Sequence, residues 1–211
     1  MKQKKSVAAS ATGGAPRPKR VAHVQTHEVR IIGGQWKRTR LPVADKPGLR
    51  PTPDRVRETL FNWLGQDLSG WRCLDAFAGT GALGFEAASR GASEVLLVEQ
   101  DTALVEQLKR TQERLKAIST HIVRGDGVAA LRQREPASLD AIFLDPPFDS
   151  TLFDAALQAA GRAVTAEGFV YLEAPKQFDD AQLEGAGLTL HRYLKAGAVH
   201  AHLLKRAPHA A

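Results

Sequence analysis

Residues 73–84 read Cys73-Leu74-Asp75-Ala76-Phe77-Ala78-Gly79-Thr80-Gly81-Ala82-Leu83-Gly84. The run Cys73–Ala76 predicts a buried strand, and Ala82–Ser89 predicts a helix that begins directly after the glycines. Glycines at such a turn let the backbone approach a ligand closely at a helix N-terminus. The stretch therefore predicts a strand–turn–helix unit with a ligand site at the turn.

Strands and helices alternate after this unit. The expected elements are strands at Val95–Val98, Ile122-Val123, Leu139–Leu144 and Phe169–Leu172, and helices at Thr102–Ala117, Val128–Gln133 and Leu152–Ala163. This alternation favours an α/β fold in which helices cover both faces of a parallel sheet. The end differs, because Leu188–Leu194 and Ala198–Leu204 alternate apolar and polar residues around a glycine turn. They predict an antiparallel hairpin, and hence a mostly parallel, seven-stranded sheet closed by that hairpin.

A small extension is expected before this α/β domain, which we assign to residues 71–211. Within residues 28–70, Glu28–Ile32 predicts a short strand that turns at Gly33-Gly34. A helix is expected to end at Leu64, with Thr52 or Asp54 as its N-cap.

The bulk composition predicts a single soluble domain in the cytoplasm. A chain of 211 residues that is 43% hydrophobic can bury one good core. No apolar run approaches the roughly 18 residues of a membrane span, so we expect a soluble protein without a membrane partner. Cys73 is the only cysteine, which excludes an intramolecular disulfide, and no Cys or His cluster suggests a metal site.

Positive charge is concentrated at the N-terminus. Residues 1–27 hold six Lys and Arg and no acid, and they are expected to form a disordered basic tail. Residues 28–57 hold eight basic residues and three acids, whereas the other 154 residues carry a formal charge of −5. A basic leading segment on a slightly acidic body predicts a polyanion partner.

Acidic residues follow the first three strands of the α/β unit. Asp75 precedes the first glycine by four residues, where its carboxylate can meet a cationic amino group. Glu99 ends the second strand and can take both hydroxyls of a ribose, or it is a solvated strand end. Asp126 follows the third strand and can read an adenine edge, or it is the N-cap of the next helix.

The glycine spacing is compatible with two cofactors. Gly79-x-Gly81-x-x-Gly84 followed by Glu99 is also the dinucleotide fingerprint, although Gly84 can simply permit helix packing. Asp75 has an ammonium group to contact in S-adenosylmethionine, which has no pyrophosphate to cradle. We therefore favour S-adenosylmethionine over a nicotinamide cofactor.

Asp145-Pro146-Pro147-Phe148 directly follows the apolar run Ala141–Leu144. Prolines hold their own φ fixed, so this loop forms a rigid pocket edge at the end of a buried strand. Asp145 and the Pro146 carbonyl can accept the hydrogens of an amino group, and Phe148 can stack on its ring. These four residues, Asp145, Pro146, Pro147 and Phe148, are the candidate catalytic residues for a planar substrate that carries an NH2 group.

Residues 29–205 resemble class I S-adenosylmethionine-dependent methyltransferases, and more narrowly the RsmD family of bacterial 16S rRNA guanine-N2 methyltransferases. The resemblance rests on Arg30–Trp36, Leu49–Leu64, Asp75-x-Phe77-x-Gly79-Thr80-Gly81 and Asp145–Phe148. It implies a Rossmann-like fold and a guanine acceptor in 16S rRNA, within the small subunit or its assembly intermediate. The chain is expected to act as a monomer.

The resemblance also implies roles for single residues. The cofactor is expected to be held by Thr52, Asp75, Phe77, Gly79, Gly81, Glu99 and Asp126. From the positive charge of residues 28–57, contacts with RNA are expected from Arg30, Lys37, Arg38, Arg40, Arg50, Arg55 and Arg57. Two alternatives stay open, namely an adenine-N6 methyltransferase on DNA or RNA and a non-catalytic RNA-binding assembly factor.

Overall fold

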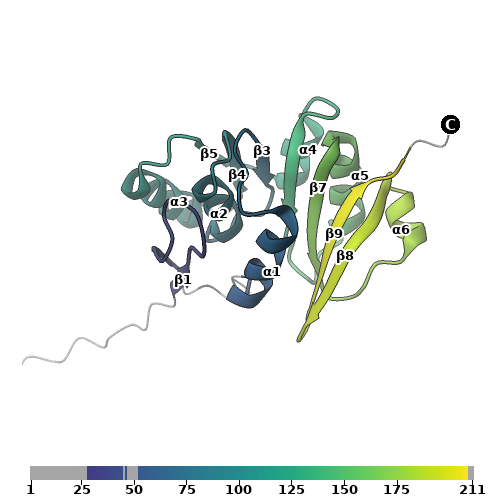
Figure 1. Cartoon of the computed structure of the whole chain (residues 1–211), viewed down its shortest axis with the longest axis horizontal. Coiled ribbons are helices and arrows are strands. Elements are labelled where there is room, and N and C mark those ends of the chain that lie inside the picture. The colour runs from purple at the N-terminus through teal and green to yellow at the C-terminus, as the bar shows by residue number, and fades with distance from the viewer. Residues whose placement is uncertain (1–27, 45, 47–51, 209–211) are drawn as a thin grey trace, which may run out of the picture.

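The computed structural model describes residues 28–44, 46 and 52–208, and its centre is one mixed sheet (Figure 1). Seven strands lie in the order β5-β4-β3-β6-β7-β9-β8. The first five of these are parallel, β9 is antiparallel to β7, and β8 is antiparallel to β9. Their bounds are β3 Arg72–Asp75, β4 Glu94–Glu99, β5 Thr120–Arg124, β6 Leu139–Leu144, β7 Val164–Ala174, β8 Leu188–Ala196 and β9 Val199–Arg206. The predicted sheet with its C-terminal hairpin is confirmed, whereas the expected tail at residues 1–27 lies outside the described residues.

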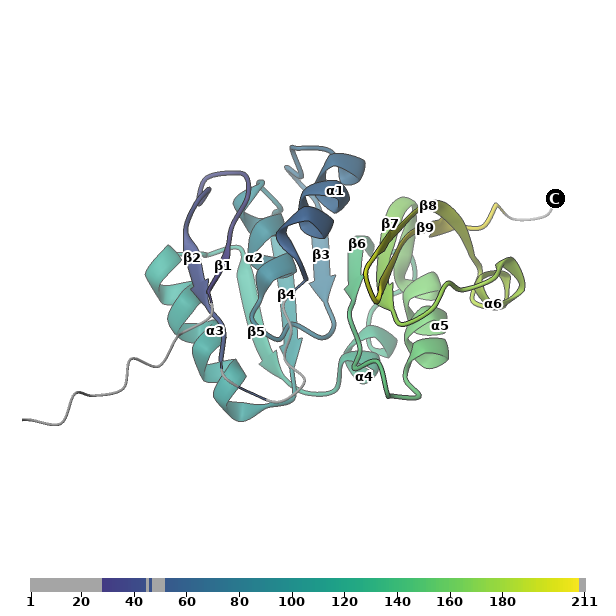
Figure 2. The same cartoon turned by 90° about the horizontal axis from the view of Figure 1, so that it is seen from below.

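Helices cover both faces of the sheet, with α1 on one side and α4 and α5 on the other (Figure 2). Their bounds are α1 Asp54–Leu64, α2 Ala82–Ser89, α3 Thr102–Leu115, α4 Gly127–Arg132, α5 Phe153–Ala163 and α6 Asp180–Glu184. Each face has its own apolar cluster, one that includes Phe61 and Phe85 and one that includes Leu157 and Leu183. Cys73 lies in the first cluster, as expected for a small core residue. Within the described part of the chain, no helix is long and apolar enough to cross a membrane.

The strand order reverses between β3 and β6. From β3 the chain moves outward through β4 to β5, and it then returns to pair β6 with the other edge of β3. The loops that leave β3 and β6 therefore diverge at the carboxyl edge of the sheet. Such a switch point is where open α/β sheets bind their ligands.

The N-terminal segment is an antiparallel hairpin of β1 (Glu28–Arg30) and β2 (Arg40–Pro42), and β2 was not predicted. Val29 and Leu41 lie in the same apolar cluster as α2, so this hairpin shares the core of the body. The buried carboxylate of Glu86 on α2 accepts hydrogen bonds from the backbone N–H groups of Ile32 and Gly33, each with a donor–acceptor distance of 2.7 Å. These bonds fasten the segment onto α2.

One local prediction is wrong, and one short helix was not predicted. The N-cap of α1 is Pro53, and neither Thr52 nor Asp54 caps the helix with its side chain. Their side chains have other partners, because Asp54 pairs with Arg30 and Arg57 and Thr52 hydrogen-bonds Glu173. The short helix α6 was also missed, although Asp179 and Gln182 form the capping box that signals a helix start.

Candidate active site

The glycine turn after β3 brings Asp75 and the start of α2 together. Gly79 and Gly81 both have positive φ, at 51° and 77°, which suits glycine far better than other residues. The N–H of Gly84 donates to Asp75 Oδ2 over 2.9 Å. A Cβ on Gly84 would lie 2.8 Å from Leu97, so this glycine also lets α2 pack on the sheet.

Glu99 supports the same turn from the end of β4. Its Oε2 accepts the N–H of Gly79 over 2.8 Å, and its Oε1 accepts the N–H of Asp101 over 2.9 Å. Glu99 is half-buried and bonded to the glycine loop, which is not the solvated strand end considered above. Each of its oxygens keeps a lone pair that a hydroxyl group could reach.

Asp126 caps α4, as the second interpretation of that residue expects. Its Oδ1 accepts the N–H of Ala129 over 2.7 Å, and its Oδ2 accepts Nε2 of Gln100 over 3.1 Å. The following Gly127 is packed so closely that a Cβ would meet the carbonyl oxygen of Ala76 at 1.9 Å. The end of β5 is therefore held against the loop that follows β3.

Asp145 differs from these three carboxylates. Its carboxylate has no hydrogen-bond partner among the residues that the structure describes. Burial, and then the nearby carboxylates of Glu173 and Asp75, raise its pKa well above the usual value. Pro146 is buried, whereas Pro147 is exposed and Phe148 retains 37% exposure. This loop thus offers a carboxylate and a partly exposed aromatic ring to a ligand.

Sequence reasoning missed Glu173, which lies at the carboxyl end of β7. Leu144 pairs with Leu172 in the register of β6 and β7, so the next residues, Asp145 and Glu173, lie side by side. Glu173 is buried, and the Tyr171 hydroxyl donates to its Oε1 over 2.9 Å. The signal for it in the sequence was an acid that directly follows the apolar run Phe169–Leu172.

The site as a whole is electrically negative. Burial raises the pKa of Asp75 to about 7, and the charge of Glu99 adds to that rise. The pKa of Glu173 is raised by burial and lowered, to a smaller extent, by hydrogen bonds from Thr52 and Tyr171 and by Arg57. Since three carboxylates with raised pKa values lie at one edge of the sheet, a cationic ligand would be attracted there and would favour their ionised forms.

The expected RNA-binding residues fall into separate groups. Arg30 pairs with Asp54 and Arg40 with Glu28, at 3.1 and 2.9 Å, while all four side chains remain well exposed. Lys37, Arg38 and Arg55 are exposed as well, and Arg50 lies outside the described residues.

Arg57 requires a correction. It is fully buried, and its guanidinium group donates to the carbonyl oxygens of Thr52 and Arg30 and to Asp54. It also lies 3.6 Å from the buried carboxylate of Glu86. A role in contacting RNA does not fit this position; Arg57 instead ties the segment before α1 to the N-terminal hairpin.

Comparisons with known proteins agree with this arrangement. The profile of the family described as conserved hypothetical protein 95 matches residues 29–205. The chain is 40% identical over 190 residues to ribosomal RNA small subunit methyltransferase D of Escherichia coli strain K12, covering 89% of this chain and 95% of that protein. The protein of the same name from Haemophilus influenzae strain Rd is 45% identical over 133 residues, covering 62% of this chain and 69% of that one.

A solved structure extends the comparison to the fold. The yhhF protein of Escherichia coli superposes with a TM-score of 0.72 and 36% sequence identity. The superposition covers 86% of this chain and 99% of that one. The similarity therefore includes both the N-terminal segment and the α/β body.

Proposed function

This chain belongs to the family described as conserved hypothetical protein 95 and is a methyltransferase, and we propose that it methylates the exocyclic N2 of a guanine in 16S rRNA of the small ribosomal subunit. The observation that carries the proposal is the carboxylate of Asp145, which has no partner among the described residues and lies at the switch point beside the glycine turn. An acceptor of this kind suits the N–H groups of an amino substituent.

S-adenosylmethionine is the methyl donor that fits the residues present. The raised pKa of Asp75 is that of a carboxylate that lacks a counter-charge, and the cofactor would bring an ammonium group to it. Asp75, Phe77, Gly79 and Gly81 would hold its methionine part, with Thr52 nearby. Glu99 and Asp126 would hold the ribose and the adenine region. When bound, this cofactor supplies an electrophilic methyl group.

The residues of the chain act mainly by positioning the acceptor. A guanine amino nitrogen is a poor nucleophile because its lone pair is delocalised into the ring. Asp145 and the Pro146 carbonyl accept hydrogen bonds from its two N–H groups. These bonds localise the lone pair of the nitrogen towards the methyl group. Asp145 then takes the proton that the nitrogen loses, or passes it to water. Phe148 stacks on the ring once the base has left its helix.

The N-terminal segment provides basic residues for the RNA. Lys37, Arg38 and Arg55 are exposed, and Arg30 and Arg40 remain well exposed within their ion pairs. Such contacts neutralise phosphates and make binding depend on salt. We infer that the protein acts as a cytoplasmic monomer, bound to the small subunit or to its assembly intermediate.

The test is methyl transfer from labelled S-adenosylmethionine into small subunits that lack the modification. Digestion of the rRNA is expected to yield the label as N2-methylguanosine, at about one methyl group per subunit. Label in N6-methyladenosine would support the adenine alternative, since Asp145 can hold either amino group. Cofactor binding without incorporation into subunits, assembly intermediates or naked rRNA would contradict the enzyme assignment and support an assembly factor.

A further inference from the structure

The C-terminal hairpin is a basic segment on an acidic body. Residues 186–211 contain no Asp or Glu, and their cations are Arg192, Lys195, Lys205 and Arg206. The preceding residues, 58–185, contain twenty Asp and Glu against eleven Lys and Arg. The two strands β8 and β9 therefore interrupt a negative surface with a positive one.

The cations of this hairpin are not neutralised within the protein. In the part of the chain that the structure describes, Arg192, Lys195 and Lys205 form no ion pair, in contrast to Arg30 and Arg40 of the N-terminal hairpin. Arg192 and Lys195 are exposed. Burial, and then the charges of Lys205 and Arg192, lower the pKa of the neighbouring His191. A bound anion would relieve the repulsion among these positive charges.

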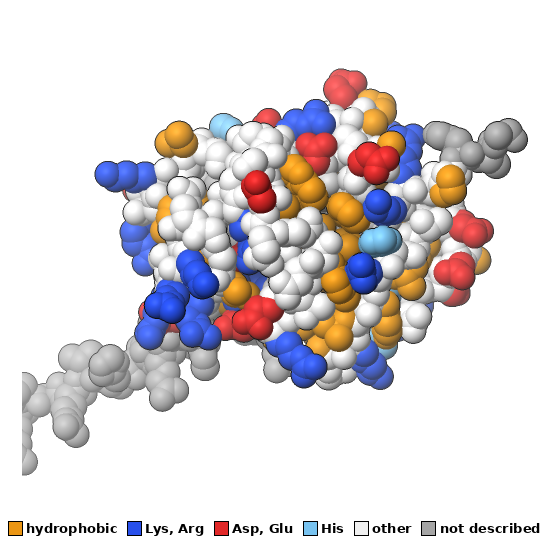
Figure 3. Space-filling model, viewed as in Figure 1, with side chains coloured by type: hydrophobic (Ala, Val, Ile, Leu, Met, Phe, Trp, Pro, Cys, Tyr) orange, Lys and Arg blue, Asp and Glu red, His pale blue; other side chains and the backbone are white. Residues whose placement is uncertain are grey.

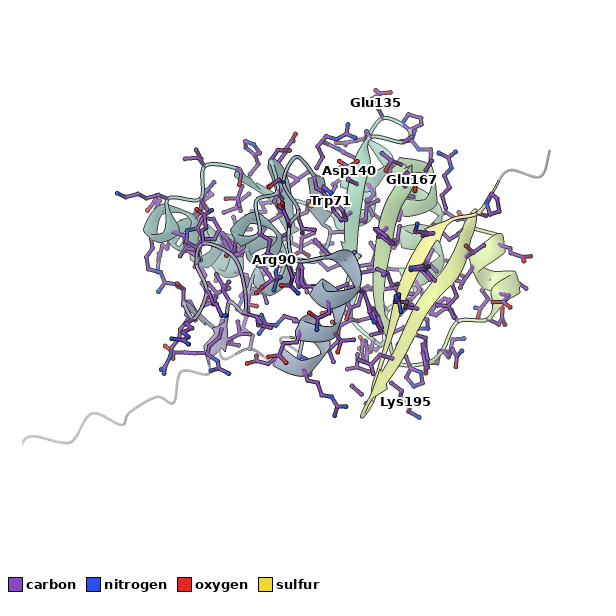
Figure 4. All side chains as sticks on the ribbon, viewed as in Figure 1. Trp71, Arg90, Glu135, Asp140, Glu167 and Lys195 are labelled. Carbon is purple, nitrogen blue, oxygen red and sulfur yellow. The ribbon has the colours of Figure 1, made fainter. Side chains whose placement is uncertain are left out.

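The tip of the hairpin lies on the same side of the molecule as the candidate acceptor loop. In the register of the sheet, Glu173 pairs with Ala201 of β9, and Ala201 pairs with Leu194 of β8. Since Asp145 lies beside Glu173, one row runs from the acceptor loop to β8 across three strand spacings, about 14 Å. Lys195 follows Leu194 at the tip of the hairpin (Figure 4).

The face of the hairpin on the side of α1 combines cations with aromatic rings. Arg192 pairs with Leu203, whose side chain belongs to the apolar cluster on that face. Towards the end of the strands opposite the hairpin tip, Lys205 lies 4.9 Å from the ring centre of Phe169, and Trp71 stacks on Phe169 with ring centres 6.1 Å apart. Lys, Arg and His side chains (blue and pale blue) border a band of hydrophobic side chains (orange) on the C-terminal half of the molecule (Figure 3). Grooves that bind single-stranded nucleic acid combine the same two groups.

We propose that the β8–β9 hairpin is a second RNA-binding surface, on which Arg192 from the face towards α1 and Lys195 from the tip contact phosphates of the strand that flanks the acceptor nucleotide. The proposal rests on the rRNA substrate proposed above and adds the surface that holds the strand beside Asp145. On this view the N-terminal hairpin and the C-terminal hairpin grip the RNA on either side of the acceptor loop.

The test compares Arg192→Gln/Lys195→Gln with wild type and with a matched control, Lys116→Gln/Arg132→Gln. The control removes the same charge from two exposed residues at the C-terminal ends of α3 and α4. We expect the hairpin variant to raise KM for the RNA at least tenfold while kcat at saturating RNA and cofactor affinity stay within twofold. Two lost contacts to a single strand should also lower the slope of log K against log salt concentration by about 1.4.

The control variant is expected to retain the wild-type KM and slope. An unchanged KM and slope in the hairpin variant, with wild-type thermal unfolding, would overturn the surface proposal while leaving the proposed function intact. A defect on assembled subunits but not on protein-free rRNA would also overturn it, because the hairpin would then contact a ribosomal protein. If the wild-type protein transfers no methyl group to any rRNA acceptor, the proposed function itself fails.

Discussion

Tyr171 donates its hydroxyl hydrogen to Glu173, two residues further along β7, over 2.9 Å. Both side chains are buried, and they point to the face of the sheet on which Asp145 lies. Glu173 is thereby held next to the catalytic candidate in a place where its charge is poorly screened. This charge is the second cause, after burial, of the raised pKa of Asp145.

Glu173→Gln is expected to shift the acidic limb of the kcat–pH profile to lower pH. Only the ionised form of Asp145 is a charged, strong acceptor that can also take the proton that the nitrogen loses, so activity should fall as the pH drops through its raised pKa. Removing the negative charge of Glu173 lowers that pKa, while Asp75 on β3 and Tyr171 on β7 continue to face Asp145. The profile is measured at saturating RNA and cofactor.

The matched control for this variant is Glu167→Gln, which removes an exposed carboxylate from the same strand. It should leave the acidic limb in place. A profile that is identical in wild type and Glu173→Gln would show that Glu173 does not act on Asp145.

Asp145→Ala is expected to lower turnover by a factor of about 10² to 10⁴, the usual contribution of a positioned acid–base or hydrogen-bonding group. Cofactor affinity should stay within a few-fold of wild type, because the glycine turn and Glu99 are unchanged. Single-turnover transfer and equilibrium titration of the cofactor measure the two effects. Asp149→Ala in the same exposed loop is the control, and turnover of Asp145→Ala close to wild type would refute the catalytic assignment.

Cofactor affinity is expected to depend on pH through Asp75. Its pKa is raised to about 7 by burial, and only the ionised form attracts a cation. Below pH 7 the affinity should therefore weaken, approaching about tenfold per pH unit. Calorimetric titration between pH 5.5 and 8.5 measures this trend.

Asp75→Asn provides the control for that titration, and it should bind the cofactor weakly with a flat pH dependence. The same variant has a signature without cofactor. When the pKa of a carboxyl group is higher in the folded than in the unfolded state, the free energy of unfolding of the protein falls as the pH rises between the two pKa values. Asp75→Asn should therefore raise the melting temperature relative to wild type at pH 8 more than at pH 5, and equal differences at both pH values would contradict the raised pKa.

Gly34→Ala is expected to loosen the N-terminal segment from α2. Gly34 has a φ of +70°, and a Cβ there would lie 1.8 Å from the carbonyl oxygen of Ser89. The strain and the clash together should cost about 2 kcal/mol or more. We expect a lower melting temperature and faster hydrogen exchange at the amides of Gln35 and Trp36, which bond to Ser89.

Gly125→Ala is the control, because a Cβ at Gly125 meets no atom within 4 Å and its φ is not positive. It should change neither the melting temperature nor the exchange of those amides. Wild-type behaviour of Gly34→Ala would mean that the backbone at Gly34 and Ser89 is separated more widely in solution.

Patterns within single segments predicted most of the fold. The spacing of apolar residues within each segment indicates whether it forms a strand or a helix. The parallel sheet, its order of elements and the final hairpin therefore followed from residues 71–206. Short elements were less visible. The strand β2 has three residues, and it is stabilised by its pairing with β1 and by the burial of Leu41 against the body.

The candidate site shows the same division. The glycine turn with Asp75, and the loop Asp145–Phe148, are contiguous motifs, and the sequence alone identified them. Glu173 lies far from both in the chain and becomes part of the site only through the register of β6 and β7. Which cations are available to RNA was also undecided, because ion pairs and burial depend on contacts between distant segments.

By itself, the sequence determined that this chain folds as a class I methyltransferase and predicted a loop that accepts an amino group, because the residues responsible are neighbours in the chain. The tertiary structure decided that Asp145 lies beside a buried Glu173, that Arg57 is enclosed within the protein, and that the hairpin tip with Lys195 lies on the side of the acceptor loop. These relationships arise from strand register and packing, which bring together residues that no local pattern connects.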